Sequence, residues 1–327
     1  MQNAELVDRF YGLKALVVGD VMIDTYTKGV VERMSPEAPV PIVNLNECFD
    51  RLGGAANVAL NLKALGAIPF VCSVIGDDAH GDRLSQLMRE HGMNTEGLVK
   101  SRQRTTTVKH RIFDGDRQLL RIDEEDTFDL TDEEHHILSH VIEGLMAQEA
   151  FDVIILQDYN KGVLTEKMVK AIIALAQSKD IPVAVDPKKK NFFAYQGVTL
   201  FKPNAKELRD GLGMHAETID EFRKAAMVLQ ERIHCQYLMV TLSGQGVIIL
   251  HDGAFQHIPA HPRNIVDVSG AGDTVLSVAA LCMALHAPHE TIASLSNLAG
   301  GMVCETVGVV PIDKERLSQE AKRISHE

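Results

Sequence analysis

Short apolar runs alternate with longer segments of helical periodicity along most of the 327-residue chain. The runs are bounded by turn residues, as buried strands are, and the longer segments carry apolar residues at spacings of three and four, as helices do. Such alternation predicts a mainly parallel sheet with helices on both faces, and ligands of such sheets bind beyond the carboxyl ends of the strands. The expected strands lie at 15–18, 70–74, 153–156, 183–185, 200–201 and 238–241, and the expected helices at 54–65, 82–91, 165–178 and 219–233.

Two segments depart from this alternation. Residues 28–46 and 105–123 are rich in β-branched side chains and alternate in polarity, which predicts strands of a small separate sheet. Such a sheet could close over a ligand and exclude water, or it could equally form an oligomer interface. The sequence contains no internal repeat, low-complexity tract or linker. We therefore expect one domain over residues 1–327, with the two segments inserted in it as a lid.

Charge and cysteine content narrow the class of protein. The net charge is −12 and the 33 lysines and arginines are scattered, which disfavours a nucleic-acid partner. A small anionic ligand remains possible, because a few cations focused in one cleft can oppose the sign of the whole molecule.

The five cysteines are odd in number and far apart, so we expect reduced thiols. No apolar run approaches the roughly 18 residues of a membrane span, and residues 1–11 lack a signal-peptide core, so we expect no membrane partner and a cytoplasmic location.

The strongest local motif is Asp-Val-Ser-Gly-Ala-Gly-Asp-Thr at 267–274, followed by an apolar stretch of helical character at 275–285. The small residues let the backbone approach a ligand closely, and amides at a helix start bind anions. They are Gly270, Ala271 and Gly272. Asp273 would then stand beside a bound phosphate and could accept a hydroxyl proton, a contribution of about 10² to 10⁴ in rate. The alternative is an ordinary helix start in which Asp273 only stabilises the helix dipole.

This octet resembles the second signature of the ribokinase family, also called the phosphofructokinase B family, and Arg-Leu-Gly-Gly-Ala-Ala-Asn at 51–57 resembles its first. Further matches follow in the family's order at 18–24, 75–81, 203–207, 240–246 and Asn297. The resemblance covers residues 15 to 300. It implies a ribokinase-like αβα sandwich with a mainly parallel central sheet and a small β lid. It also implies an ATP-dependent carbohydrate kinase that uses Mg²⁺.

The resemblance assigns roles residue by residue. Asp273 matches the catalytic base, and the three small residues before it match the anion hole for the transferring phosphate. Residues matching the nucleotide and magnesium side are Asn204, Glu207, Thr241, Ser243, Gly244, Gly246 and Asn297, with Glu207 reaching Mg²⁺ through water. Residues matching the sugar side are Asp20, Asp24, Gly53, Gly54 and Asn57. Plainer readings exist: the glycine pair could merely open a helix, Asn204 could cap one, and Thr241 could be an ordinary strand residue.

Within the family, the segment Arg-Met-Ser-Pro-Glu-Ala-Pro-Val-Pro-Ile at 33–42 is the most distinctive. It resembles the members that phosphorylate D-glycero-β-D-manno-heptose 7-phosphate at the anomeric hydroxyl, giving the 1,7-bisphosphate for lipopolysaccharide heptose. Segments 117–123, 157–162 and 186–188 are similar to the same members. Many of these kinases are fused to a nucleotidyltransferase, and the lack of a later His-x-Gly-His leads us to expect the stand-alone form. Open alternatives are a kinase for ribose or a fructose phosphate, and a non-catalytic sensor on the same fold.

A substrate that already bears a phosphate needs cations at the end of the site away from ATP. Lys109 and Arg111, two apart on an expected strand, would share one face. Together with Lys161 and Lys188 they are the candidates for binding the sugar phosphate. The alternative is that lid strands carry these charges for solubility. Exposed lid strands also lead us to expect a homodimer formed through the lid.

Overall fold

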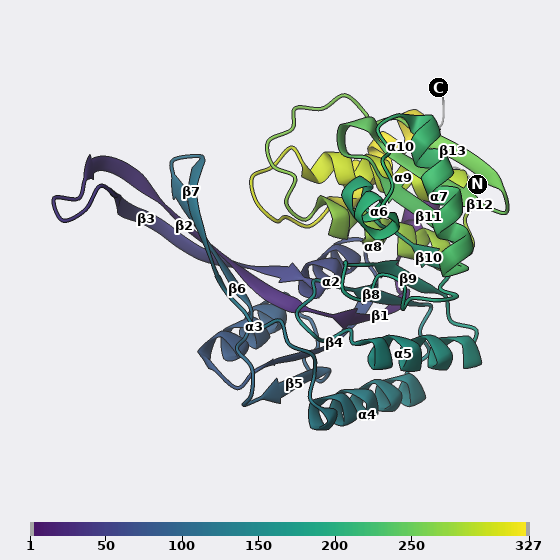
Figure 1. The fold of residues 1–327 in the computed structure, drawn as a ribbon, viewed down its shortest axis with the longest axis horizontal. Coiled ribbons are helices and arrows are strands. Elements are labelled where there is room, and N and C mark those ends of the chain that lie inside the picture. The colour runs from purple at the N-terminus through teal and green to yellow at the C-terminus, as the bar shows by residue number, and fades with distance from the viewer. Residues whose placement is uncertain (1–2, 325–327) are drawn as a thin grey trace.

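The computed structural model describes residues 3–324, and in them a nine-stranded sheet forms the centre of the molecule (Figure 1). Its order is β13-β12-β11-β10-β9-β8-β1-β4-β5, with β12 and β13 antiparallel and the others parallel. The strands are β1 (Lys14–Gly19), β4 (Ile68–Gly76), β5 (Leu98–Ser101), β8 (Val153–Gln157), β9 (Val183–Asp186), β10 (Leu200–Phe201), β11 (Tyr237–Thr241), β12 (Val247–His251) and β13 (Ala254–Ile258). The central strands are buried on both faces, as expected of a parallel sheet covered by helices.

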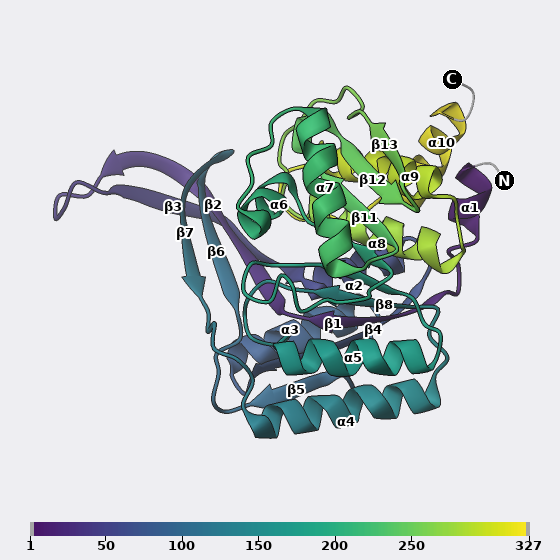
Figure 2. The ribbon, with the colours of Figure 1, turned by 45° about the vertical axis from the view of Figure 1, so that its right-hand side comes forward.

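Helices cover both faces of this sheet, and each face has its own apolar core (Figure 2). One core contains α1 (Asn3–Asp8), α2 (Ala55–Ala64), α3 (Ala79–Glu90), α8 (Ala271–Ala284), α9 (His289–Val303) and α10 (Lys314–Ile324). The other contains α4 (Asp132–Gln148), α5 (Glu166–Ser178), α6 (Ala205–Leu212) and α7 (Ile219–Ile233). None of the helices in residues 3–324 is long and apolar enough to cross a membrane.

A second sheet of order β3-β2-β6-β7 projects from the central body (Figure 1). Its strands are β2 (Val21–Met34), β3 (Pro41–Gly54), β6 (Val108–Asp114) and β7 (Arg117–Glu124). Both segments that we expected to leave the main sheet lie in it. The hairpin of β2 and β3 begins earlier than expected, at Val21, because the first six residues of β2 are buried and continue the apolar pattern of the core.

The predicted α/β sandwich with a mainly parallel sheet is confirmed, and so are the predicted strands and helices. The sequence analysis omitted β5, β12 and β13. Only one short 3-10 turn, Ser243–Gln245, separates β11 from β12, and the two strands form an antiparallel hairpin, so the strand-helix alternation did not mark β12. Strand β13 is half-exposed and lacks a continuous apolar run.

Candidate active site

The glycine-rich octet forms the start of α8, as the sequence predicted. Helix α8 begins at Ala271, and Gly270 before it has a φ of 78°, which favours glycine. A Cβ at Gly270 would lie 2.9 Å from Asn57 Nδ2. The Ala271 amide donates to Val268 O, so it is already engaged. No side chain caps this helix, which leaves the next first-turn amides, on Gly272 and Asp273, as the donors suited to an anion.

Asp273 is 3% exposed and three side chains donate to its carboxylate. Asn57 Nδ2 lies 2.7 Å from Oδ2, and Tyr159 Oη and Gln157 Nε2 lie 2.8 and 3.3 Å from Oδ1. Burial raises the pKa of Asp273 to about 6, against the lowering effect of the bonds from Asn57 and Tyr159. A carboxylate with that pKa is mostly ionised near neutral pH, and it is a better proton acceptor than an exposed aspartate.

A cleft of about 1200 Å³ lies beside this helix start. It brings together residues that the sequence assigned to the nucleotide: Asn204, Thr241, Ser243, Gly244, Gly246 and Asn297, with Gly270, Ala271, Gly272 and Asp273 at one end. Asn297 Nδ2 also donates to Pro259 O at 2.8 Å. The cleft therefore joins the ends of β10 and β11 to the start of α8.

Two lysines and two carboxylates form a network in the same region. Lys202 Nζ lies 3.0 Å from Asp186 Oδ2, and Lys188 Nζ lies 3.1 Å from Asp186 Oδ1 and 2.6 Å from Glu207 Oε1. A Cβ on Gly272 would lie 3.7 Å from Asp186 Oδ2 and 3.8 Å from Lys202 Nζ, so the network borders the α8 start. It supplies positive charge where a phosphate would meet the first-turn amides.

The sequence analysis did not assign site roles to Gln157, Tyr159, Asp186 or Lys202. A signal was present: Gln157 and Asp186 end parallel strands, and Lys202 directly follows one. Polar residues at carboxyl ends of neighbouring parallel strands meet at one edge of the sheet, where ligands bind.

Asn204 caps α6, as the plainer reading of this residue expected, and it also lines the large cleft. Its Oδ1 accepts from the Glu207 amide and Glu207 Oε2 accepts from the Asn204 amide, both at 2.8 Å. Within residues 3–324 no three His, Cys, Asp or Glu side chains gather to hold a metal by themselves. Magnesium in kinases usually takes one or two carboxylates, waters and substrate phosphates, and Glu207 and Asp186 beside the cleft fit that donor set.

Three of the expected sugar-side residues, Asp24, Gly53 and Gly54, lie in β2 and β3 of the second sheet, and Asn57 follows in α2. A Cβ at Gly53 would lie 2.4 Å from Asp24 Oδ2, and one at Gly54, whose φ is 60°, would lie 2.3 Å from Asp20 O. Only glycine therefore fits at either position. Asp24 Oδ1 pairs with Arg111 Nη2 at 2.6 Å, and Asn57 donates to the Asp273 carboxylate.

Asp20 does not join this group. Its carboxylate accepts three backbone amides, from Tyr159 and Lys161 on Oδ2 and from Val163 on Oδ1, at 2.8 to 3.1 Å. The residue is 1% exposed. Burial and three backbone amides hold the carboxylate inside the protein, which argues against the expected contact with a sugar.

The four expected phosphate-binding cations separate into two groups. Lys109 and Lys161 both pair with Glu125, Lys109 also pairs with Asp123, and Arg111 pairs with Asp24. Lys188 belongs instead to the network of Asp186 and Glu207 in the cleft. The expectation that Lys188 binds the far phosphate of the sugar needs correction, because β9 delivers this residue to the side of Asn204 and the α8 start.

Known proteins resemble this chain over nearly its whole length. A D-beta-D-heptose 7-phosphate kinase of Bordetella bronchiseptica is 38% identical over 324 residues, which are 98% of this chain and 99% of that protein. A protein of Syntrophotalea carbinolica named "Bifunctional protein HldE" is 38% identical over 314 residues, 96% of this chain. The chain spans 64% of that bifunctional relative's length.

Solved structures share the fold at lower identity. Phosphofructokinase-2 of Escherichia coli, in complex with potassium, matches with a TM-score of 0.81 and 20% identity, over 97% of this chain and all of that one. A ribokinase of Arabidopsis thaliana, with ribose and ATP, matches with a TM-score of 0.73 and 17% identity, over 94% of this chain and 99% of that one. The profile of the pfkB family carbohydrate kinases matches residues 13–315, and the chain therefore belongs to the pfkB family of carbohydrate kinases.

Proposed function

We propose that this protein transfers the γ-phosphoryl group of ATP to the anomeric hydroxyl of D-glycero-β-D-manno-heptose 7-phosphate, giving the 1,7-bisphosphate. The observation that carries the proposal is the position of Asp273, a buried carboxylate with a raised pKa at the uncapped start of α8. On one side it borders the large cleft, and on the other it contacts Asn57 of the glycine-led helix α2. The Bordetella bronchiseptica relative, 38% identical over its whole length, supports the choice of sugar.

Asp273 accepts the proton of the attacking hydroxyl as the new bond to the γ-phosphorus forms. The bond from that phosphorus to the bridging oxygen breaks, and its electron pair leaves with ADP. The Gly272 and Asp273 amides, with Lys188 and Lys202, stabilise the charge on the transferred group. Magnesium, when bound, would neutralise phosphate charge, and Glu207 would hold it through water. ATP would lie along the remainder of the cleft, against the β11 end and Asn297.

The 7-phosphate would bind among Lys109, Arg111 and Lys161. These side chains are largely buried and paired with carboxylates. A phosphate offers more acceptor oxygens and more charge than one carboxylate, so it can take these cations over from Glu125. The second sheet would then act as a lid that closes the sugar site against water, within a chain that works as one domain.

A panel of acceptors at equal concentration tests the assignment. The panel contains heptose 7-phosphate, the same heptose without phosphate, ribose, fructose 1-phosphate and fructose 6-phosphate, with ADP release coupled to NADH oxidation. We expect the highest kcat/KM for heptose 7-phosphate. A higher kcat/KM for ribose would refute the heptose assignment but leave a sugar kinase.

Lys161→Met is expected to raise KM for heptose 7-phosphate about tenfold, the typical loss for one charge-assisted hydrogen bond, with KM for ATP unchanged. Lys190→Met is the matched control, because Lys190 is also paired with one carboxylate, that of Asp129. Steady-state kinetics measures both constants. An equal rise in KM for heptose 7-phosphate in both variants, or none in Lys161→Met, would exclude Lys161 from the phosphate site.

Turnover is expected to fall as the pH drops through about 6. Burial raises the pKa of Asp273 to about 6, and only the ionised carboxylate accepts the hydroxyl proton, so the active fraction is lost on the acid side. Below this pKa, kcat should fall about tenfold per pH unit. Sugar phosphates titrate near the same pH, so kcat is recorded at saturating substrates. A kcat that stays level down to pH 5 would contradict the role of Asp273.

We also propose a homodimer formed through the lid, working in the cytoplasm. The β2–β3 hairpin carries the exposed apolar residues Val30, Met34, Val40 and Leu45, and β7 carries Leu120 and Ile122. Large exposed apolar side chains on a projecting sheet favour a protein partner. The absence of any disulfide among the five cysteines fits a reducing compartment. Light scattering should give twice the 36.0 kDa chain mass, and a monomeric mass at micromolar concentration would refute the dimer.

A further inference from the structure

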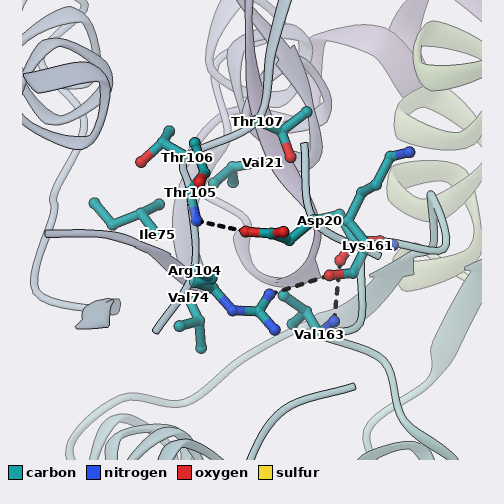
Figure 3. A pocket seen from close by; sticks show the side chains of 11 residues that line it. Asp20, Val21, Val74, Ile75, Arg104, Thr105, Thr106, Thr107, Lys161 and Val163 are labelled. Atoms are coloured by element: carbon teal, nitrogen blue, oxygen red, sulfur yellow. Dashed lines mark hydrogen bonds between the residues drawn. The ribbon is translucent and has the colours of Figure 1, made fainter. Parts of the chain in front are cut away.

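Buried polar groups hold the loop that follows β8, residues 158–163, and Figure 3 shows two of them, Asp20 and Arg104, beside Lys161 and Val163. Asp20 accepts the amides of Tyr159, Lys161 and Val163, which are the alternate residues of this loop. One buried carboxylate thus sets three points of the backbone. Such a group is costly to bury unless it is fully hydrogen-bonded, and here the three amides satisfy it.

Arg104 holds the same loop from the other side. Its Nη1 donates to Lys161 O at 3.1 Å and its Nη2 donates to Phe128 O at 3.2 Å, with the side chain 4% exposed. Figure 3 shows the guanidinium lying between the strand of Val74 and the segment of Lys161 and Val163. Gly162 has a φ of 92°, and a Cβ there would lie 1.9 Å from Phe128 O. Asp20 and Arg104 therefore fix the backbone conformation of the loop.

The backbone conformation of this loop determines where Tyr159 lies. Its hydroxyl donates to Asp273 Oδ1 at 2.8 Å, and its ring lies 5.5 Å from Lys188 Nζ. Among the three side chains that donate to Asp273, Tyr159 is the one that lines the large cleft. A tyrosine hydroxyl swings away from its acceptor when the backbone below it shifts, so the loop anchors control this bond.

We propose that Tyr159 is a positioning residue for the base: its hydroxyl orients the Asp273 carboxylate and favours the ionised form, and Asp20 acts through Tyr159 by anchoring the loop. This inference rests on the proposed phosphoryl transfer and assigns Asp20 a role other than sugar binding. The other charged groups that act on Asp273 are Asp186, which raises its pKa, and Lys202, which lowers it. Replacing Tyr159 leaves both in place.

Tyr159→Phe tests the proposal, with Tyr195→Phe as its matched control. The Tyr195 hydroxyl also donates to a carboxylate at 2.8 Å, but that carboxylate is Asp158 rather than Asp273. Removing one hydrogen bond from an ionised acid should move the acid limb of the kcat profile upward by about half to one pH unit. We expect this shift in Tyr159→Phe, with KM for the sugar phosphate unchanged, and no shift in Tyr195→Phe. An unmoved limb in Tyr159→Phe, or an equal shift in both variants, would overturn the proposal.

Asp20→Asn tests the link to the loop. An asparagine keeps the size of the side chain but offers one acceptor oxygen for three amides. If Asp20 acts through Tyr159, the acid limb of the kcat profile moves to higher pH in Asp20→Asn as well. The double variant of Asp20→Asn and Tyr159→Phe should then show the same shift of the limb as Tyr159→Phe alone. If the shift in the double variant were the sum of the two single shifts, Asp20 would not act through Tyr159. If Asp20→Asn does not fold, as a thermal melt would show, Arg104→Lys replaces it, because Arg104 also anchors the loop through Lys161 O.

A titration of Asp273 that does not depend on turnover tests the role of Tyr159 separately from the identity of the sugar. Carbon NMR of aspartate-labelled protein follows the Asp273 carboxyl directly, and Asp273→Asn identifies its signal. The titration midpoint should rise in Tyr159→Phe relative to wild type even if heptose 7-phosphate is not the substrate. An unchanged midpoint would overturn the role of Tyr159, whatever the acceptor panel shows.

Discussion

Replacing Asp273 by asparagine is expected to reduce turnover by about 10² or more while ATP still binds. The amide has the shape of the carboxylate and can still accept from Tyr159, but it cannot take a proton from the attacking hydroxyl. The cleft that would hold ATP keeps its other lining residues, and loss of a negative charge near the phosphates does not weaken nucleotide binding. Coupled kinetics measures turnover, and calorimetry measures the Kd for ATP.

Asp78→Asn is the control for the alternative that Asp273 serves only its helix. Asp78 is also an aspartate at a helix start, where it caps α3 by accepting from the Gly81 amide. Asparagine caps helices about as well as aspartate, so Asp78→Asn should keep near-wild-type turnover. If Asp273→Asn also kept turnover within a few-fold of wild type, Asp273 would be a cap or a packing residue and the proposed mechanism would be wrong.

The second large effect is expected from a single methyl group, in Gly272→Ala. An added Cβ meets only Asp186 Oδ2 at 3.7 Å and Lys202 Nζ at 3.8 Å, which are ordinary contacts, so the fold has room for it. The methyl group would occupy the space beside the first-turn amides where the proposed mechanism places the transferring phosphate. A displacement of about 1 Å costs roughly 10² in rate, so we expect turnover to fall by that order with no loss of thermal stability.

Gly144→Ala is the control for the effect that a glycine-to-alanine replacement has on helix stability alone. Gly144 lies within α4, and a Cβ there meets nothing within 4 Å. Alanine in a helix stabilises by roughly 0.5–1 kcal/mol relative to glycine, so both variants should melt at or above the wild-type temperature. Only Gly272→Ala should lose turnover. Full activity of Gly272→Ala would mean that the phosphate binds elsewhere. A large drop in the melting temperature of Gly272→Ala would contradict the expectation that the fold has room for the methyl group.

Local features were readable from the residues alone. Strand β1, helix α7 and the start of α8 follow from apolar periodicity and from the glycine-rich octet, because backbone conformation there depends on near neighbours in the chain. The family resemblance added expected roles for Asp273, Asn57 and the nucleotide residues. In the structure Asn57 bonds to Asp273, which borders the cleft that Asn204, Thr241 and Asn297 also line. The edge hairpin of β12 and β13 lacked this signal, since its strands pair with each other without an intervening helix.

The sequence by itself determined the α/β class, the helix start that presents Gly272 and Asp273, and the acidic side chain suited to proton transfer. Only the tertiary structure decided which donors surround that carboxylate, that Asp20 anchors a loop, and that Lys188 lies with Asp186 and Glu207. The reason is separation along the chain: Asn57 is 216 residues from Asp273, Tyr159 is 114 residues away, and Asp20 is 139 residues from Tyr159. Contacts between such distant residues arise from the packing of whole strands and helices, and no local pattern of residue types encodes them.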